Sequence, residues 1–268
     1  MINRILVLIK QVPATENVKM DEETGTLVRT NVEAVINPLD LYAVEEAIRI
    51  KEQDGGTPWV GVVSMGPPAA AEAIREAIAM GCDEGVLISG REFSGADTWA
   101  TAYALSQAVS HLGEFDLVLC GERATDGETG QVGPMVGTML DLPVLTYVSR
   151  IESSEAGTVV AHRVIEGGHE VVRSVLPALL SVVKEINEPR LPNLSGKRAA
   201  RHAEIPVLTP EEIGADISCI GLSGSPTRVV KVSHPTLTRV GKVVSTETAS
   251  PEECIEQLMQ ALQSAEIR

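Results

Sequence analysis

Residues 121–134, GERATDGETGQVGP, combine the features that a phosphate-binding loop needs. Their glycines let the backbone approach a phosphate closely, and Thr129 and Gln131 add a hydroxyl and an amide donor. The GxxxxGK[ST] pattern of a P-loop is absent from the chain. The residue types of this segment therefore fit a phosphate site and an ordinary glycine-rich turn equally well.

Residues 94–98, SGADT, offer a second place for an anion. Thr98 and Thr101 are expected on the first turn of a helix, where hydroxyls and free N–H groups can meet a negative charge. Ser94 or Asp97 can also cap that helix without any ligand. The residues alone favour this simpler role.

No group of side chains forms a recognisable catalytic or metal-binding motif. The five histidines lie far apart in the sequence, at His111, His162, His169, His202 and His234. The four cysteines form no CxxC pair and indicate reduced, mostly buried thiols: Cys82, Cys120, Cys219 and Cys254. We therefore expect no catalytic residue and no metal site, and any chemistry must come from a bound cofactor.

Short apolar runs alternate with helical patterns in the first half of the chain. Strands are expected over residues 4–9, 59–64, 85–88 and 116–120, and helices begin at residues 37, 68 and 97. Asn37 is expected to cap the first helix, with Pro38 at its first position. Such alternation predicts an α/β fold with a doubly wound, mostly parallel sheet of the Rossmann-like type.

The candidate phosphate-binding segments occupy equivalent places in this predicted sheet. Residues 10–13, 64–67, 94–98 and 121–134 each follow a predicted strand. Ligands of open parallel sheets bind at the carboxyl ends of the strands, so these four segments are expected to meet at one edge.

The chain becomes rich in strand patterns after Pro143. Residues 158–165 and 170–175 are predicted to form a β-hairpin around a turn at 166–169, and residues 177–183 form a further strand. Residues 187–203 are expected to be an exposed loop with a basic stretch, and residues 251–265 a helix. We predict a nucleotide-binding domain over residues 1–225, which includes the loop, and a C-terminal arm over 226–268 that packs on a partner subunit or wraps the main domain.

The composition excludes some classes of partner and location. A net charge of −15 argues against nucleic acid, because phosphate backbones require a basic surface. The chain starts directly with a strand-like segment rather than a signal peptide, and no apolar run approaches the roughly 20 residues of a membrane helix. The expectation is a cytoplasmic protein that does not insert into membranes.

Six segments resemble, in order and spacing, the beta subunit of electron transfer flavoproteins. They are VLIKQVP, INPLDLYAVEEAIRIKE, SMGPP, EAIAMGCDEGVLISGREFSGADTWAT, DLVLCGERATDGETGQVGP and EGGHEVVRSVLPALLSVVKEINEPR, the last being similar to the signature region of that family. The resemblance covers essentially the whole chain. It implies an adenine nucleotide alpha hydrolase-like form of the fold and a heterodimer with an alpha subunit that carries FAD.

The resemblance implies an adenine-containing cofactor for this chain. Simple members of the family hold AMP as a structural element, whereas electron-bifurcating members hold a second FAD that accepts a hydride from NADH. The SGADT segment, the DGxTxQVGP pattern and the SPT-x-V stretch at 225–229 look like the bifurcating group, which favours FAD with AMP as the alternative. Departures from that group are Ser94 for Gly, Gly130 for Ala, and residues 122–125 (ERAT) for RQAI.

The resemblance also implies which residues hold the cofactor. The adenine and ribose would lie near Asn37, Met65 and Gly66, and the pyrophosphate near the SGADT segment and the loop at 126–133. The full implied set is Asn37, Met65, Gly66, Asp97, Thr98, Thr101, Gly121, Asp126, Gly127, Glu128, Thr129, Gly130, Gln131, Val132 and Gly133.

The family docks on acyl-CoA dehydrogenases, or similar oxidoreductases, through an exposed leucine in a recognition loop. Leu194 occupies the corresponding place here, although a leucine folded back under the loop is the commoner case from sequence alone. The implied function is an electron relay between NADH or such a dehydrogenase and a further acceptor, by flavin-based bifurcation. A non-bifurcating subunit with structural AMP is the alternative, and the missing P-loop counts against a nucleotide hydrolase.

Overall fold

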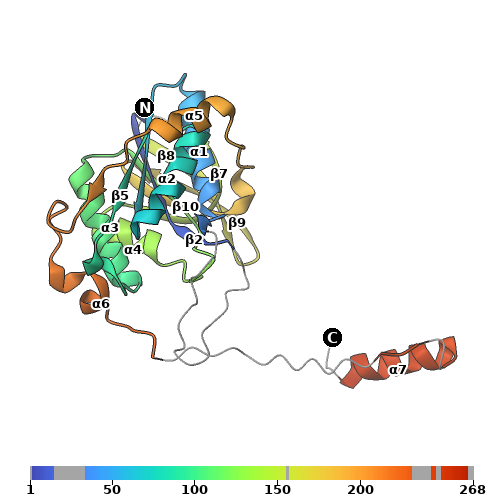
Figure 1. Ribbon diagram of the computed structural model, residues 1–268. Coiled ribbons are helices and arrows are strands. Elements are labelled where there is room, and N and C mark those ends of the chain that lie inside the picture. Colours follow the sequence, from blue (N-terminus) through green and yellow to red (C-terminus); the bar gives the residue numbers. More distant parts are fainter. Residues whose placement is uncertain (1, 15–33, 155–156, 231–242, 246–248, 265–268) are drawn as a thin grey trace. The chain divides into compact units, whose positions relative to one another are not determined.

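The computed structural model describes residues 2–14, 34–154, 157–230, 243–245 and 249–264 (Figure 1). The chain divides into two units, Met1–Val230 and Lys231–Arg268, which are described separately. The second unit contains α7 (Pro251–Ser264), which bears out the helix expected there, and residue 265 lies outside the described residues. The functional assignment of residues 1–225 and of the arm at 226–268 stays a prediction.

A nine-stranded sheet forms the centre of the first unit. Its order is β11-β5-β4-β1-β6-β10-β7-β8-β9, and all neighbours from β11 to β7 are parallel, whereas β7, β8 and β9 pair antiparallel. The strands are β1 (Arg4–Ile9), β4 (Trp59–Met65), β5 (Glu84–Ile88), β6 (Leu117–Gly121), β7 (Val144–Ser153), β8 (Thr158–Ile165), β9 (Gly168–Val175), β10 (Ala178–Val182) and β11 (Val207–Leu208). A separate antiparallel pair joins β2 (Gln11–Pro13) to β3 (Ala34–Ile36).

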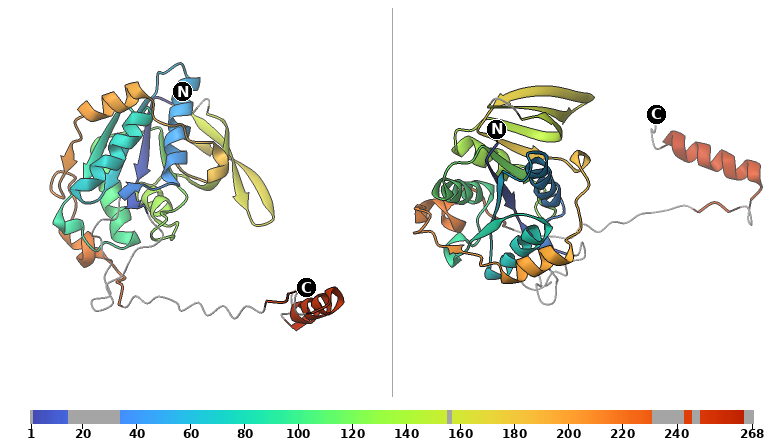
Figure 2. Two further views of the ribbon diagram at one scale, coloured as in Figure 1. Left: turned by 45° about the vertical axis from the view of Figure 1, so that its right-hand side comes forward. Right: turned by 90° about the horizontal axis from the view of Figure 1, so that it is seen from above.

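Helices cover both faces of the parallel part of the sheet. One face packs against α1 (Asp40–Gln53) and α2 (Ala71–Met80), and the other against α3 (Thr98–Leu112) and α4 (Val132–Met139). The other helices of this unit are α5 (Leu194–His202), α6 (Gly221–Gly224), η1 (Pro68–Ala70), η2 (Arg91–Phe93), η3 (Lys184–Ile186) and η4 (Ile217–Cys219). Figure 2 shows β8 and β9 extending beyond the helices that cover the rest of the sheet.

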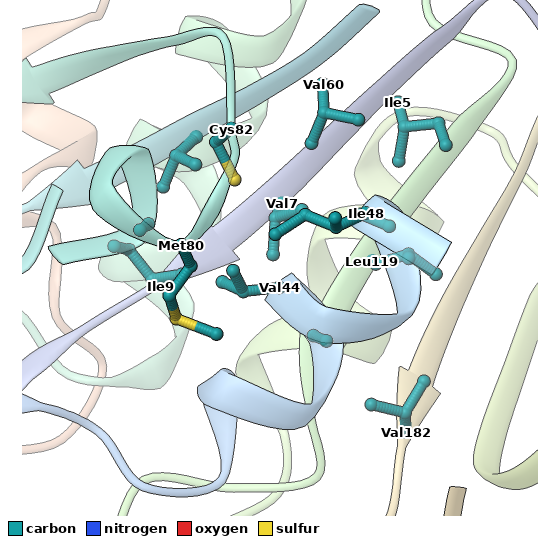
Figure 3. Packing of buried hydrophobic residues seen from close by; sticks show 14 of the residues in the cluster. Ile5, Val7, Ile9, Val44, Ile48, Val60, Met80, Cys82, Leu119 and Val182 are labelled. Atoms are coloured by element: carbon teal, nitrogen blue, oxygen red, sulfur yellow. The ribbon is translucent and has the colours of Figure 1, made fainter. Parts of the chain in front are cut away.

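The continuous apolar run of β1 is explained by burial on both faces. Ile5, Val7 and Ile9 pack toward α1 and α2, where Figure 3 shows them with Val44 and Ile48. The alternate residues of β1 pack toward α3 and α4. A strand that is covered on both sides needs apolar residues at every position, because successive side chains point to opposite faces.

The chain crosses the sheet twice, first beside β1 and later between β10 and β11. It runs outward from β1 to β4 and β5, then returns through α3 to β6 on the other side of β1. The carboxyl ends of β1 and β6 therefore mark the position at which doubly wound sheets bind their ligands, and this position is here called the crevice between β1 and β6.

The predicted α/β fold with its doubly wound, mostly parallel sheet is confirmed, as is the β-hairpin. Two sequence predictions are wrong. Residues 187–203 are not a plain loop, because Asn193 Oδ1 accepts a hydrogen bond from Gly196 N at 2.8 Å and starts α5. Asn37 does not cap α1, which begins at Asp40 after Leu39.

No helix in the described part of the chain is long and apolar enough to span a membrane. Within the same residues, no cluster of three or more His, Cys, Asp or Glu side chains could hold a metal ion, and His234 falls outside them.

Candidate functional site

The crevice between β1 and β6 brings the four candidate segments together. In the parallel register Ile9 lies opposite Ser64, so Lys10 follows β1 beside Met65 at the end of β4. Leu8 lies opposite Cys120, so the glycine-rich segment begins next to the end of β1. The SGADT segment joins them at the start of α3, where Thr98 Oγ1 donates to Gln131 Oε1 at 3.3 Å.

Asn37 holds the glycine-rich loop in place. Its side chain is fully buried, its Nδ2 donates to the carbonyl of Arg123 at 2.9 Å, and its Oδ1 accepts from Thr125 N at 3.1 Å. Both ends of the amide are therefore used by the loop. A cap at the start of α1 was the expected role, but the partners of Asn37 lie far away in the sequence.

The tip of the loop is exposed and has a defined shape. The carbonyl of Ala124 accepts hydrogen bonds from Gly127 N at 3.3 Å and Glu128 N at 2.8 Å. Glu128 and Gly130 have φ angles of 53° and 62°, in the left-handed region that glycine adopts freely and other residues adopt at a cost. A salt bridge of 2.6 Å from Lys10 Nζ to Asp126 ties the tip to the end of β1.

Asp97 is occupied by protein donors. Its Oδ1 caps α3 by accepting from Trp99 N at 3.0 Å and Ala100 N at 3.1 Å, and its Oδ2 accepts from the amide and hydroxyl of Thr227 at 2.9 and 2.8 Å. Desolvation raises the pKa of this carboxyl, but the hydrogen bonds from Ala100, Thr227 and Trp99 outweigh it and hold the pKa below its usual value. The role of Asp97 in this structure is to position the start of α3.

The starts of α3 and α4 face the same crevice. The first N–H groups of a helix have no partner within it and carry a partial positive charge, so each helix start attracts an anion. Thr98 and Thr101 are half-buried at the start of α3, and Val132 and Gly133 begin α4. Two such helix starts side by side suit a ligand with two phosphate groups.

Most glycines of the site are required by internal packing. A Cβ on Gly121 would lie 2.4 Å from Asp40 Oδ1, one on Gly133 would lie 2.4 Å from Cys120 Sγ, and one on Gly66 would lie 2.9 Å from Ala70 Cβ. Gly127 differs, since no heavy atom lies within 4 Å of its Cβ position. Internal packing therefore does not require a glycine at position 127, at the tip of the loop.

Asp40 is a site residue that sequence analysis missed. It is buried and accepts a hydrogen bond from Lys10 N at 2.7 Å, with further hydrogen bonds from Asn37 and the Gly121 backbone. Desolvation raises the pKa of Asp40 to about 7, although these hydrogen bonds and the charge of Lys10 oppose the shift. The only signal in the sequence was a carboxylate in the first turn of a helix that follows a strand.

Leu194 is fully available to a partner. Its side chain is 88% exposed at the start of α5, and Leu191 nearby is 91% exposed. The folded-back position that sequence alone favoured is therefore wrong. The outward residues of α5 include three exposed cations, Lys197, Arg198 and Arg201.

Both ends of the segment 187–203 are fixed to the core. Arg190 donates to Glu45 of α1 at 2.8 and 3.0 Å and to Glu52 at 2.6 and 2.9 Å. At the other end, Arg75 Nη1 donates to the carbonyls of Ala200 and Ala203 at 2.7 and 2.9 Å. The segment is thus presented as a shaped surface rather than a free loop.

Comparison with known proteins supports one family. The Electron transfer flavoprotein domain family matches residues 24–213. The chain is 44% identical over 264 residues to the electron transfer flavoprotein subunit beta of Thermoanaerobacterium thermosaccharolyticum, covering 98% of this chain and 99% of the relative. It is 42% identical over 247 residues to the caffeyl-CoA reductase-Etf complex subunit CarD of Acetobacterium woodii, covering 92% and 94%. It is also 42% identical over 237 residues to protein FixA of Azotobacter vinelandii, covering 86% and 83%.

Proposed function

The chain belongs to the electron transfer flavoprotein family as a beta subunit, and on this premise we propose that it binds FAD in the crevice between β1 and β6 and relays electrons by flavin-based bifurcation. Its partner in the heterodimer is an alpha subunit. The electrons come from NADH or an acyl-CoA dehydrogenase and pass to a further acceptor. The heterodimer works in the cytoplasm, a reducing compartment that four free thiols fit.

The paired starts of α3 and α4 carry this proposal. Thr98 and Gln131 join them, and the open space at Gly127 lies in the loop that leads into α4. A diphosphate matches two anion-binding helix starts better than the single phosphate of AMP does. Bound FAD supplies the ability to accept a hydride and to release electrons one at a time. The residues of this chain bind and orient it, and none of them transfers a proton or forms a covalent bond.

The alternative is a non-bifurcating subunit with structural AMP. The same crevice holds an adenine nucleotide in both cases, so the fold does not distinguish them. The hydrogen bonds between Thr227 and Asp97 favour FAD. Thr227 belongs to the SPT-x-V stretch, and these bonds fix the start of α3, which would face the second phosphate of FAD. The similarity to CarD, a subunit of a caffeyl-CoA reductase-Etf complex, supports a partner that acts on CoA thioesters.

Cofactor content tests the proposal directly. The chain is co-purified with its alpha subunit, the cofactors are released by denaturation, and FAD and AMP are quantified by chromatography. Two FAD and no AMP per heterodimer is the expected result, together with flavin reduction by NADH under anaerobic conditions. One FAD and one AMP, with flavin that stays oxidised in NADH, would establish the alternative.

Replacing Leu194 with alanine is expected to weaken electron transfer with the acyl-CoA dehydrogenase about tenfold, because an exposed apolar anchor contributes on the order of 1–2 kcal/mol to a transient complex. Cofactor content should not change. Stopped-flow kinetics at several dehydrogenase concentrations would measure the effect. Val171→Ala on β9 removes another exposed apolar side chain, 59% exposed, elsewhere on the molecule and serves as the control. Equal rates in Leu194→Ala and the wild type would remove the anchor role.

A further inference from the structure

We propose that Lys10 is the cation that neutralises the phosphates of the bound nucleotide, and that its salt bridge with Asp126 opens when the nucleotide enters. This inference rests on the proposed function, in which the crevice between β1 and β6 binds a phosphate-bearing adenine cofactor.

Lys10 has a fixed backbone and an available side chain. Its N–H donates to Asp40 at 2.7 Å, and its carbonyl accepts from Asn37 N at 2.7 Å, immediately after the central strand β1. Its side chain remains 46% exposed. The backbone therefore anchors the residue at the crossing point of the sheet while the ammonium group can move between neighbouring oxygens.

The charges around the crevice require such a cation. Asp97, Glu122, Asp126 and Glu128 all lie on the two segments that would face the phosphates, in a chain with a net charge of −15. Arg123 is also near, but it pairs with Glu122. A helix start offers only about half a positive charge, so two of them offset part of a diphosphate but not the neighbouring carboxylates as well.

The salt bridge between Lys10 and Asp126 is suited to exchange. Both oxygens of Asp126 accept from Lys10 Nζ, at 2.6 and 2.8 Å, but Asp126 is 33% exposed and lies at the open tip of the loop. An exposed pair of this kind contributes little to stability, so little is lost when it opens. The Asp126 carboxylate can turn to solvent, whereas Lys10 gains a charge-assisted hydrogen bond to a phosphate oxygen.

A mutant cycle on the heterodimer tests the assignment. Lys10→Gln, Asp126→Asn and the double variant are stripped of nucleotide and titrated calorimetrically with AMP and with adenosine. Lys10→Gln should bind AMP at least about tenfold more weakly and adenosine as well as the wild type, since the lost contact is worth about 1.4 kcal/mol or more. Asp126→Asn should bind AMP a few-fold more tightly than the wild type, because it frees Lys10.

The controls separate charge from folding. Lys10→Arg keeps the cation and should stay within about threefold of the wild type for AMP, a difference below about 1 kcal/mol. Lys51→Gln removes a similar salt bridge with Asp83, formed at 2.5 Å away from the crevice, and should not alter either affinity.

Equal weakening of AMP binding in Lys10→Gln and Asp126→Asn, with a matching loss for adenosine, would show that Lys10 only positions the loop. That result would overturn the assignment while the proposed function stands. A wild-type heterodimer that binds neither AMP nor FAD at this site would instead overturn the proposed function itself.

Discussion

Replacing Arg190 with alanine is expected to destabilise the folded chain by about 3 kcal/mol and to slow electron transfer to the dehydrogenase as well. Arg190 pairs with Glu45, whose side chain is only 6% exposed, and with the more exposed Glu52. Without the guanidinium, the carboxylate of Glu45 on α1 stays buried but loses its ion-pair partner. The loss also releases the start of the segment 187–203, so the exposed Leu191 and Leu194 are no longer held in one position.

Urea denaturation followed by circular dichroism would measure the loss of stability, and stopped-flow kinetics the transfer rate. Arg163→Ala is the matched control, because Arg163 pairs with Glu170, which is 44% exposed, and no buried carboxylate is left behind. Adding Glu45→Gln to Arg190→Ala should restore much of the stability, since it removes the buried charge. If Arg190→Ala were as stable as the wild type and transferred electrons at the same rate, Arg190 would not have the stabilising role described above.

The parallel core of the fold could be predicted because its signals are local. Five of the six residues of β1 are apolar and buried, on both faces of the strand, and each predicted strand of the first half reappears within one residue of its expected place. The position of β10 had no such signal. All five of its residues are buried, but only tertiary packing places it between β6 and β7 in the middle of the sheet. Strand order depends on contacts that a local pattern does not encode.

The candidate site shows the same division. The cap of α3 by Asp97 could be predicted, because Asp97 Oδ1 accepts hydrogen bonds from Trp99 N and Ala100 N, which lie only two and three residues away. Its link to Thr227 spans 130 residues and could not. The helix-capping rule failed for Asn37 for the same reason. The Asn37 side chain forms hydrogen bonds with the glycine-rich loop, 86 and 88 residues further along the chain. Residues that tie distant segments together escape sequence patterns, and in this crevice they are the ones that shape the loop.

Asp40→Asn is expected to change how the stability of the chain depends on pH. Burial raises the pKa of Asp40 from 3.8 to about 7, so between these values the carboxyl is protonated in the folded chain and ionised in the unfolded chain. Because the folded state binds one proton more than the unfolded state in this range, the contribution of Asp40 to stability decreases as the pH rises. This contribution has its full value below about pH 4 and is lost by about pH 7. Over that range the advantage of the wild type over the variant should shrink by up to about 4 kcal/mol.

The variant also loses a hydrogen bond. Asn offers one carbonyl oxygen and one NH₂ group where Asp40 accepts from the backbone of both Lys10 and Gly121, so one buried N–H faces another donor at a cost of about 1–3 kcal/mol. Urea denaturation of both proteins between pH 4 and 8 would separate this constant loss from the pH-dependent one. Asp83→Asn is the control for the hydrogen bond, because Asp83 accepts from Val60 N at 2.8 Å but is 34% exposed.

If the difference in the free energy of unfolding between the wild type and Asp40→Asn stays constant across this pH range, Asp40 is already ionised in the folded chain at acid pH. The carboxylate would then be a permanent negative charge at the crossing point of the sheet, and the demand on Lys10 as a counter-charge would be greater still.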